Sequence, residues 1–239
     1  MARAIASGLD EAGLPSQLAR LEEASKVDLA QFELIGLGTP VFYYKEPFNV
    51  KDFIKGLPSL KGKSAFLFIT TGGHPTNTLL RIAKLLEKKG ATVIAAFQAF
   101  GYDTFPAYIG QDRMKGHPTE EELKEAERFG RGLPGRLEEI LSGQRSLLPG
   151  FKREYGKFFR LSLILKPSIM RLVLPKKIII QEKCTACGLC AEKCPVGNIE
   201  LRPLPQFGKK CIYCYFCERI CPEEAIFCDW SFIKKRLSE

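Results

Sequence analysis

Two stretches of this chain share one spacing of cysteines: Lys183–Pro195, KCTACGLCAEKCP, and Lys210–Pro222, KCIYCYFCERICP. In each stretch, four cysteines in the order C-x2-C-x2-C-x3-C are followed directly by a proline. Short spacers bring several soft thiolates around one group of irons, so the pattern is typical of iron–sulfur cluster ligands. Two copies separated by a short loop predict a module that transfers electrons.

A pair of structural zinc sites is the alternative, because zinc sites also use C-x2-C pairs. Each zinc ion would need four ligands arranged as two pairs. That arrangement gives no reason for a third evenly spaced cysteine, or for the proline that follows the fourth. The sequence therefore favours clusters over zinc.

The cysteines also divide the chain into two parts. All nine follow Lys183 in a chain of 239 residues, so the long first part depends on hydrophobic packing. The last part is too short to build much core and needs metal ions as staples. Thiolates dedicated to metal fit a reducing compartment. The first residues show no secretion signal. The sequence contains no uninterrupted run of about 18 apolar residues, so a transmembrane helix is not expected. We expect a cytoplasmic protein.

Positive charge is concentrated in one segment. The net charge is +9, and residues 145–183 contain ten lysines and arginines against two glutamates. Three interpretations stay open: a solvated face, a docking surface for an acidic redox partner, and peripheral contact with an anionic membrane. Nucleic-acid binding is not expected, because no recognised module accompanies the charge.

The first part of the chain alternates strand and helix patterns. Continuous apolar runs predict buried strands at 32–38, 64–70 and 91–97, and a weak strand is expected at 17–21. Helices are predicted at 1–12, 48–56, 79–90 and 119–141, the last beginning with a capping box. This order predicts an α/β fold, a parallel sheet with helices on both faces and ligands at the carboxyl ends of the strands.

The C-terminal part, residues 177–226, resembles the bacterial two-cluster ferredoxins. The repeat of CPVGNI at 194–199 as CPEEAI at 221–226 supports the resemblance. It implies two [4Fe–4S] clusters, with the fourth cysteine of each run serving the other cluster. One cluster would be held by Cys184, Cys187, Cys190 and Cys221, and the other by Cys194, Cys211, Cys214 and Cys217.

The N-terminal part resembles flavodoxins, and the whole chain is similar to flavodoxin–ferredoxin fusion proteins. The resemblance rests on IGLGTPVF at 35–42 and TTGGHP at 70–75, and on Gly101–Asp103, which lie where such proteins close over the flavin ring. It implies FMN at three loops, with the contact residues Thr39, Pro40, Val41, Phe42, Thr71, Gly72, Gly73, Gly101, Tyr102 and Asp103.

The sequence departs from flavodoxins at its start. A flavodoxin begins with a strand and a loop that binds the flavin phosphate at the N-terminus of the first helix. This sequence begins at what corresponds to that helix. Three explanations stay open: translation starts upstream of Met1, an N-terminal piece is missing, or the domain keeps only a structural role. Tight FMN binding is therefore not expected for the chain as given.

These features predict three segments: a flavodoxin-like domain at 1–145, a basic apolar connector with short helical turns at 146–177, and a two-cluster ferredoxin domain, of small α+β type, at 178–239. We expect an electron carrier with a redox partner, because nothing resembles an acid–base pair or nucleophile for a substrate. The alternatives are a flavin-dependent reductase fed by the clusters, and a flavin-free docking subunit of a larger redox complex.

Single residues outside the motifs receive plain structural interpretations. Cys228, the ninth cysteine, is expected to be a small buried hydrophobic residue. Tyr213 and Tyr215 are expected to shield a cluster from water. Trp230 and Phe232 are expected to pack the C-terminus against its domain.

Overall fold

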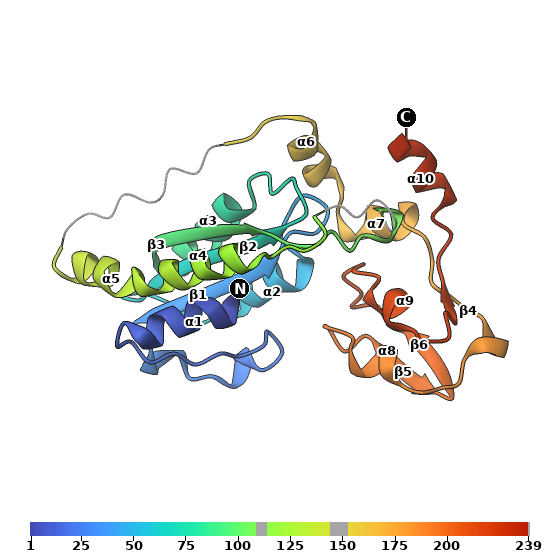
Figure 1. Ribbon diagram of the computed structural model, residues 1–239, viewed down its shortest axis with the longest axis horizontal. Helices are drawn as coiled ribbons and strands as arrows, with labels where there is room; N and C mark the ends of the chain where they lie inside the picture. The colour runs from blue at the N-terminus through green and yellow to red at the C-terminus, as the bar shows by residue number, and fades with distance from the viewer. Residues whose placement is uncertain (109–113, 144–152, 239) are drawn as a thin grey trace. The chain divides into compact units, whose positions relative to one another are not determined.

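The computed structural model describes residues 1–108, 114–143 and 153–238 (Figure 1). The chain divides into two compact units, one of Met1–Asp103 with Arg113–Leu163, the other of Thr104–Asp112 with Ile164–Glu239. The predicted domain boundary at 145 lies outside the described residues. The described part of the predicted connector is shared between the two units rather than separate from them.

A three-stranded parallel sheet forms the centre of the first unit (Figure 1). Its strands are β1 (Leu34–Pro40), β2 (Ser64–Thr71) and β3 (Thr92–Phe100), in the order β1-β2-β3. The central strand β2 is buried almost throughout, as its continuous apolar sequence predicts. The predicted fold class, a parallel α/β sheet followed by a small α+β region, is confirmed.

Helices cover both faces of this sheet. They are α1 (Ala2–Glu11), α2 (Phe48–Gly56), α3 (Thr78–Lys88), α4 (Glu120–Arg131) and α5 (Leu133–Leu141). A further helix, α6 (Lys157–Ile164), contributes no residue to the two core clusters of the sheet. Leu67 of β2 packs in one core cluster with residues of α2 and α3. Phe66, the preceding residue, packs in a second cluster with residues of α1, α4 and α5. Alternate side chains of one strand therefore serve two cores, one on each face.

Two sequence predictions for this unit need correction. No strand forms at 17–21, where Leu18 is 55% exposed, because an isolated extended segment has no neighbour to pair its backbone groups. The single helix predicted at 119–141 is two helices that meet at Gly132, just before Pro134 at the start of α5, since proline cannot continue a helix through its interior. The predicted capping box of Thr119 and Glu122 is confirmed.

The second unit consists of short elements. It contains α7 (Pro167–Val173), α8 (Leu189–Glu192), α9 (Phe216–Ile220), α10 (Ser231–Ser238) and the strands β4 (Ile178–Ile179), β5 (Ile199–Arg202), β6 (Leu204–Phe207) and β7 (Ile226–Phe227). Strand β4, before the first cysteine run, pairs antiparallel with β7, which follows the second run; β5 and β6 form a hairpin between the runs. The pairing of β4 with β7 brings the two ends of the cysteine-rich region together. Short helical turns were predicted in the connector, and α6 and α7 confirm them.

Within the described ranges, no helix is both long enough and apolar enough to cross a membrane.

Candidate iron–sulfur sites

The two cysteine runs share one backbone conformation. Two residues after the first cysteine of each run, Ala186 (φ 53°) and Tyr213 (φ 59°) are left-handed; two residues later, Gly188 (φ 79°) and Tyr215 (φ 53°) are left-handed as well. Such turns point successive backbone N–H groups to one side and create concave sites for negative charge. Short helices follow at once, with the third cysteine of each run in the first turn. The repeat seen in the sequence is therefore a repeat in local structure.

The eight cysteines of the two runs surround two separate cavities. The first cavity is lined by Cys184, Cys187, Cys190 and Cys221. The second cavity is lined by Cys194, Cys211, Cys214 and Cys217. In each set, three cysteines come from one run and the fourth comes from the other. This is the grouping that the resemblance to two-cluster ferredoxins implies; metal ligation by these residues stays a prediction.

Backbone N–H groups donate to several of the sulfur atoms. The N–H of Asn198 lies 3.3 Å from Sγ of Cys194, and the N–H of Ala225 lies 3.3 Å from Sγ of Cys221. Each donor follows its cysteine by four residues, so the two bonds are equivalent in the repeat. Hydrogen bonds to cluster sulfurs stabilise negative charge and are one of the means by which a protein sets a cluster's reduction potential.

Burial changes the acidity of the thiols. It raises the pKa of Cys214 and raises that of Cys217 to about 12, and it also raises the pKa of the Cys190 thiol. Burial thus favours the protonated thiol of these three cysteines as long as no metal is bound. Because iron binds the thiolate, loading of the cavities releases protons.

The residues present fit an iron–sulfur cluster in each cavity. All nine cysteines are free of disulfide bonds, and each cavity offers four soft sulfur donors. Over the described residues, no three His, Cys, Asp or Glu side chains are grouped so as to hold one metal ion. Four cysteines line each of the two cavities, the number of ligands that a [4Fe–4S] cluster requires.

An aromatic cluster lies beside the second cavity. Tyr215 lines that cavity and is fully buried; its hydroxyl donates to the carbonyl of Pro175 at 2.6 Å, and its ring lies edge-on to Trp230 with 4.5 Å between centroids. Cys228 and Trp230 are buried in the same cluster. The predicted burial of Cys228 and the predicted packing of Trp230 are therefore confirmed. Phe232 is 66% exposed, so most of its side chain lies outside this buried cluster.

The loops predicted to bind flavin meet at the carboxyl ends of the strands. The N–H of Val41 donates to the carbonyl of Thr70 at 2.8 Å, and the N–H of Gly101 donates to that of Thr71 at 3.0 Å. Gly72 lies so close to Asp103 that an added Cβ would be 2.7 Å from the Cβ of Asp103. The structure thus brings together the loops that follow β1, β2 and β3.

The other predicted flavin residues occupy the same loops. The Thr39 hydroxyl, nearly buried, donates to the carbonyl of Pro40, and the hydroxyl oxygen of Thr71 accepts from the N–H of Gly73. Phe42 turns the chain by pairing with Lys45. Tyr102 is 42% exposed. Binding of FMN by these residues stays a prediction.

Sequence reasoning missed that α6 packs on these loops. The ring of Phe158 stacks on His74 with 3.9 Å between centroids and on Tyr44 with 4.8 Å. The Asn77 side chain donates to the carbonyl of Glu154 at 2.8 Å and accepts from its N–H at 2.9 Å. No signal in the sequence pairs Phe158 with His74, since the contact joins segments more than eighty residues apart. One aromatic face of this edge is therefore covered by the protein itself.

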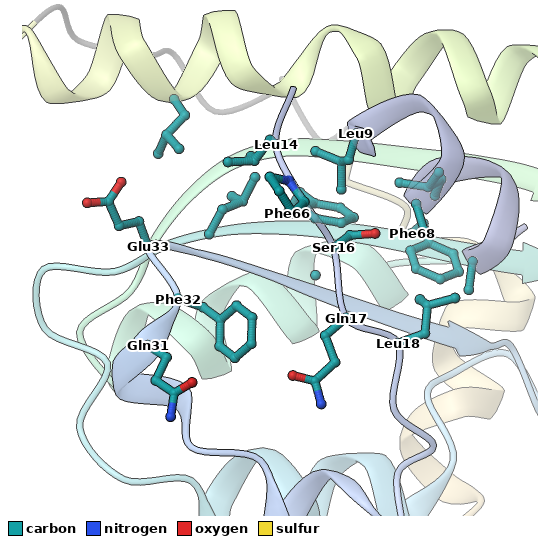
Figure 2. A pocket seen from close by; sticks show the side chains of 17 residues that line it. Leu9, Leu14, Ser16, Gln17, Leu18, Gln31, Phe32, Glu33, Phe66 and Phe68 are labelled. Atoms are coloured by element: carbon teal, nitrogen blue, oxygen red, sulfur yellow. The ribbon is translucent and has the colours of Figure 1, made fainter. Parts of the chain in front are cut away.

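A larger cavity lies beside β1 and contains none of the predicted site residues. Its volume is about 460 Å³, and it is lined by α1, the free edge of β1, the extended chain at 14–18, Phe66 and Phe68. Figure 2 shows Leu9 and Phe66, which share a core cluster, side by side at this cavity. The lining is mostly apolar and offers no set of metal or phosphate ligands.

Comparison with known proteins identifies the cysteine-rich region. The 4Fe-4S binding domain family matches residues 177–200 and 209–227. An uncharacterized polyferredoxin-like protein of Methanocaldococcus jannaschii is 32% identical over 75 residues, which cover 25% of this chain and 45% of that protein. The chain thus spans less than half the length of this curated relative. The C-terminal part of the chain carries a 4Fe–4S binding domain, as the cysteine spacing predicts.

Solved structures similar to the chain include flavodoxins. A flavodoxin from the domain Archaea is 20% identical, with a TM-score of 0.44, and the match covers 57% of this chain and 87% of that one. The two-electron reduced flavodoxin of Megasphaera elsdenii is 27% identical, with a TM-score of 0.39, over 53% of this chain and 86% of that one. At these TM-scores the similarity gives no residue-by-residue correspondence.

Proposed function

We propose that this chain, which joins a parallel α/β unit to a 4Fe–4S binding domain, is an electron carrier that holds two [4Fe–4S] clusters. The observation that carries the proposal is the pair of cavities, each lined by four cysteines drawn from both runs. When bound, the clusters supply one-electron chemistry. The protein holds them, shields them and determines which partner reaches them.

The shared ligands make the two sites a single folding unit. Cys194 belongs to the cavity of the second run and Cys221 to the cavity of the first. Neither cavity is complete unless both runs are folded. A small unit with short strands and little core gains stability from such cross-linking, since metal binding to a preformed site adds directly to the free energy of folding.

The redox partner is proposed to be an acidic protein. Seven lysines and arginines in the described part of the basic segment are exposed: Arg153, Lys157, Arg160, Lys166, Arg171, Lys176 and Lys183. Leu172 and Val173, which follow Arg171 in the same segment, are 84% and 51% exposed. Exposed positive charge with a few apolar contacts suits a transient encounter with an acidic surface, in which charge steers association.

A flavin-linked function is the second candidate. The observation that favours it is the meeting of three loops at the carboxyl edge of the sheet, where open α/β sheets bind ligands. The stacking of Phe158 on His74 opposes it, because this contact covers an aromatic face that a flavin ring could use. We therefore propose that this chain transfers electrons without tightly bound FMN.

Anaerobic reduction tests the carrier proposal. The purified chain is titrated with dithionite, and its visible absorbance and electron paramagnetic resonance (EPR) spectrum are followed. Two reversible one-electron steps with cluster signals are expected. Bound flavin together with NAD(P)H oxidation would favour the reductase, whereas constant co-purification with a larger redox complex would favour the docking subunit. A chain with no reversible electron uptake contradicts the proposal.

A further inference from the structure

A lysine lies against one of the two cysteine cavities. Nζ of Lys177 donates to Sγ of Cys211 at 3.4 Å, and Lys177 lines the second cavity. The residues that line the first cavity include Glu223 and neither a lysine nor an arginine. The two sites therefore have the same kind of ligands and different surrounding charge.

Aromatic rings hold this ammonium in place. Nζ of Lys177 lies 4.4 Å from the ring centroid of Tyr215, 5.7 Å from that of Tyr213 and 5.8 Å from that of Phe207. A cation over several ring faces is attracted by their quadrupoles. Lys177 is half-buried whereas the preceding Lys176 is exposed, so the charge of Lys177 is less screened by water and salt.

The sequence repeat does not provide a second lysine. Lys177 precedes the first cysteine of its run, Cys184, by seven residues, and the residue seven positions before Cys211 is Leu204. Although Lys177 comes before the first run, it lies at the cavity to which the second run contributes three cysteines. The repeat of the cysteine runs therefore does not extend to Lys177, and the two cavities differ in charge.

We infer that Lys177 makes the cluster held by Cys194, Cys211, Cys214 and Cys217 easier to reduce than the other, so that this cluster accepts the first electron. The inference rests on the proposed function. Reduction adds one electron from a low-potential donor, dithionite in the test, and moves no atom; the cluster becomes more negative by one charge. A nearby fixed positive charge stabilises that product.

Redox titration of three variants tests the inference. Lys177→Met is expected to lower the equilibrium constant for reduction of one cluster by about tenfold, a shift of about 59 mV for one electron, and to leave the other midpoint unchanged. Lys177→Arg keeps the charge and is expected to keep both midpoints. Lys176→Met removes an exposed charge next to it and is the matched control, expected to move neither midpoint. Iron and sulfide contents are measured for every sample.

The outcomes separate the inference from the proposed function. Loaded clusters whose higher midpoint falls in Lys177→Met support both, whereas a fall of the lower midpoint alone contradicts the assignment of the first electron. Loaded clusters with midpoints equal to those of the wild type overturn the role of Lys177 and leave the carrier intact. Wild-type protein without iron and sulfide overturns both. If Lys177→Met does not load, the wild type still decides: two midpoints at least about 59 mV apart are expected, and coincident midpoints contradict the inference.

Discussion

The fourth cysteine of each run has the same surroundings in both repeats. Each precedes a proline, and each sulfur accepts a backbone N–H from the residue four positions later. Each also faces the cavity of the opposite run. Cysteines of one run therefore line different cavities, so substitutions within one run should affect different clusters.

Cysteine substitutions are expected to group by cavity and not by run. Cys221→Ala and Cys184→Ala should each remove the same cluster, lower iron by about half and leave the same residual EPR signal. Cys211→Ala, in the same run as Cys221, should leave the other signal. Cys228→Ala is the control, because Cys228 is buried away from the lining of both cavities, and it should keep full iron. Equal residual spectra for Cys221→Ala and Cys211→Ala would contradict the grouping.

At the scale of single residues, the sequence predicts which cysteines line the cavities but not which other side chains lie against the predicted sites. The spacing of the runs is a local signal, so the eight cysteines can be read directly from it. Lys177 and Phe158 carry no such signal. Their contacts, with Cys211 and with His74, join residues 34 and 84 positions apart, and nothing in a single sequence pairs them.

Among the elements, α1 and α4 pack unusually close together through two glycines. An added Cβ at Gly8 would meet the carbonyl oxygen of Glu127, and one at Gly130 would meet the carbonyl oxygen of Ile5. Backbone atoms cannot move aside as a flexible side chain can. Glycine at these two positions is thus required by packing rather than by backbone conformation.

Gly130→Ala is therefore expected to destabilise the sheet unit by about 1–3 kcal/mol. Gly135→Ala, in α5, is the matched control: nothing lies within 4 Å of its added Cβ, and alanine there should be neutral or stabilise by up to about 1 kcal/mol. Urea unfolding followed by circular dichroism measures both changes. A destabilisation by Gly135→Ala equal to that of Gly130→Ala would show that the close helix contact is not the cause.

The start of α4 depends on its capping box. The Thr119 hydroxyl accepts from the N–H of Glu122 at 3.2 Å, and the Glu122 carboxylate accepts from the N–H of Thr119 at 2.7 Å. Thr119→Ala should cost about 1 kcal/mol of unfolding free energy, while Thr119→Ser should retain most of it. Urea midpoints at neutral pH compare the two. Equal losses would mean that the hydroxyl is not the group that matters.

Element types follow from the sequence more closely than element boundaries. Apolar runs and helical periodicity predict β1, β2, β3 and four of the helices, because burial on two faces of a sheet leaves a strong pattern. The division of α4 from α5 is missed, since the apolar periodicity continues past Gly132 and Pro134. The strand expected at 17–21 is wrong because pairing depends on a neighbour that a local pattern does not reveal.

On the scale of the whole molecule, charge is distributed unevenly. The basic segment accounts for most of the net charge of +9, and its described lysines and arginines are mainly exposed. The boundaries of the units are less predictable, because residues 104–108 belong with the cysteine-rich unit despite their distance in sequence. Only tertiary contacts reveal that assignment.

Electron transfer to an acidic protein acceptor should slow as salt increases. Screening shortens the range of the attraction from about 10 Å at 0.1 M to about 3 Å at 1 M ionic strength. Replacing Lys166 and Arg171 by glutamine should lower the second-order rate constant at low salt. The control replaces Lys84 and Lys88, which are exposed on α3 of the sheet unit, and should change the rate constant less. Stopped-flow oxidation of the reduced clusters measures the rates, and equal effects of the two pairs would argue against a docking role for the basic segment.

The central claim is that the paired cysteine cavities hold two [4Fe–4S] clusters, and metal analysis of the anaerobically purified chain tests it most directly. Iron, acid-labile sulfide and zinc are measured together on one sample. About eight irons and about eight sulfides per chain, with zinc absent, are predicted. About two zinc ions per chain with little iron or sulfide would contradict the claim.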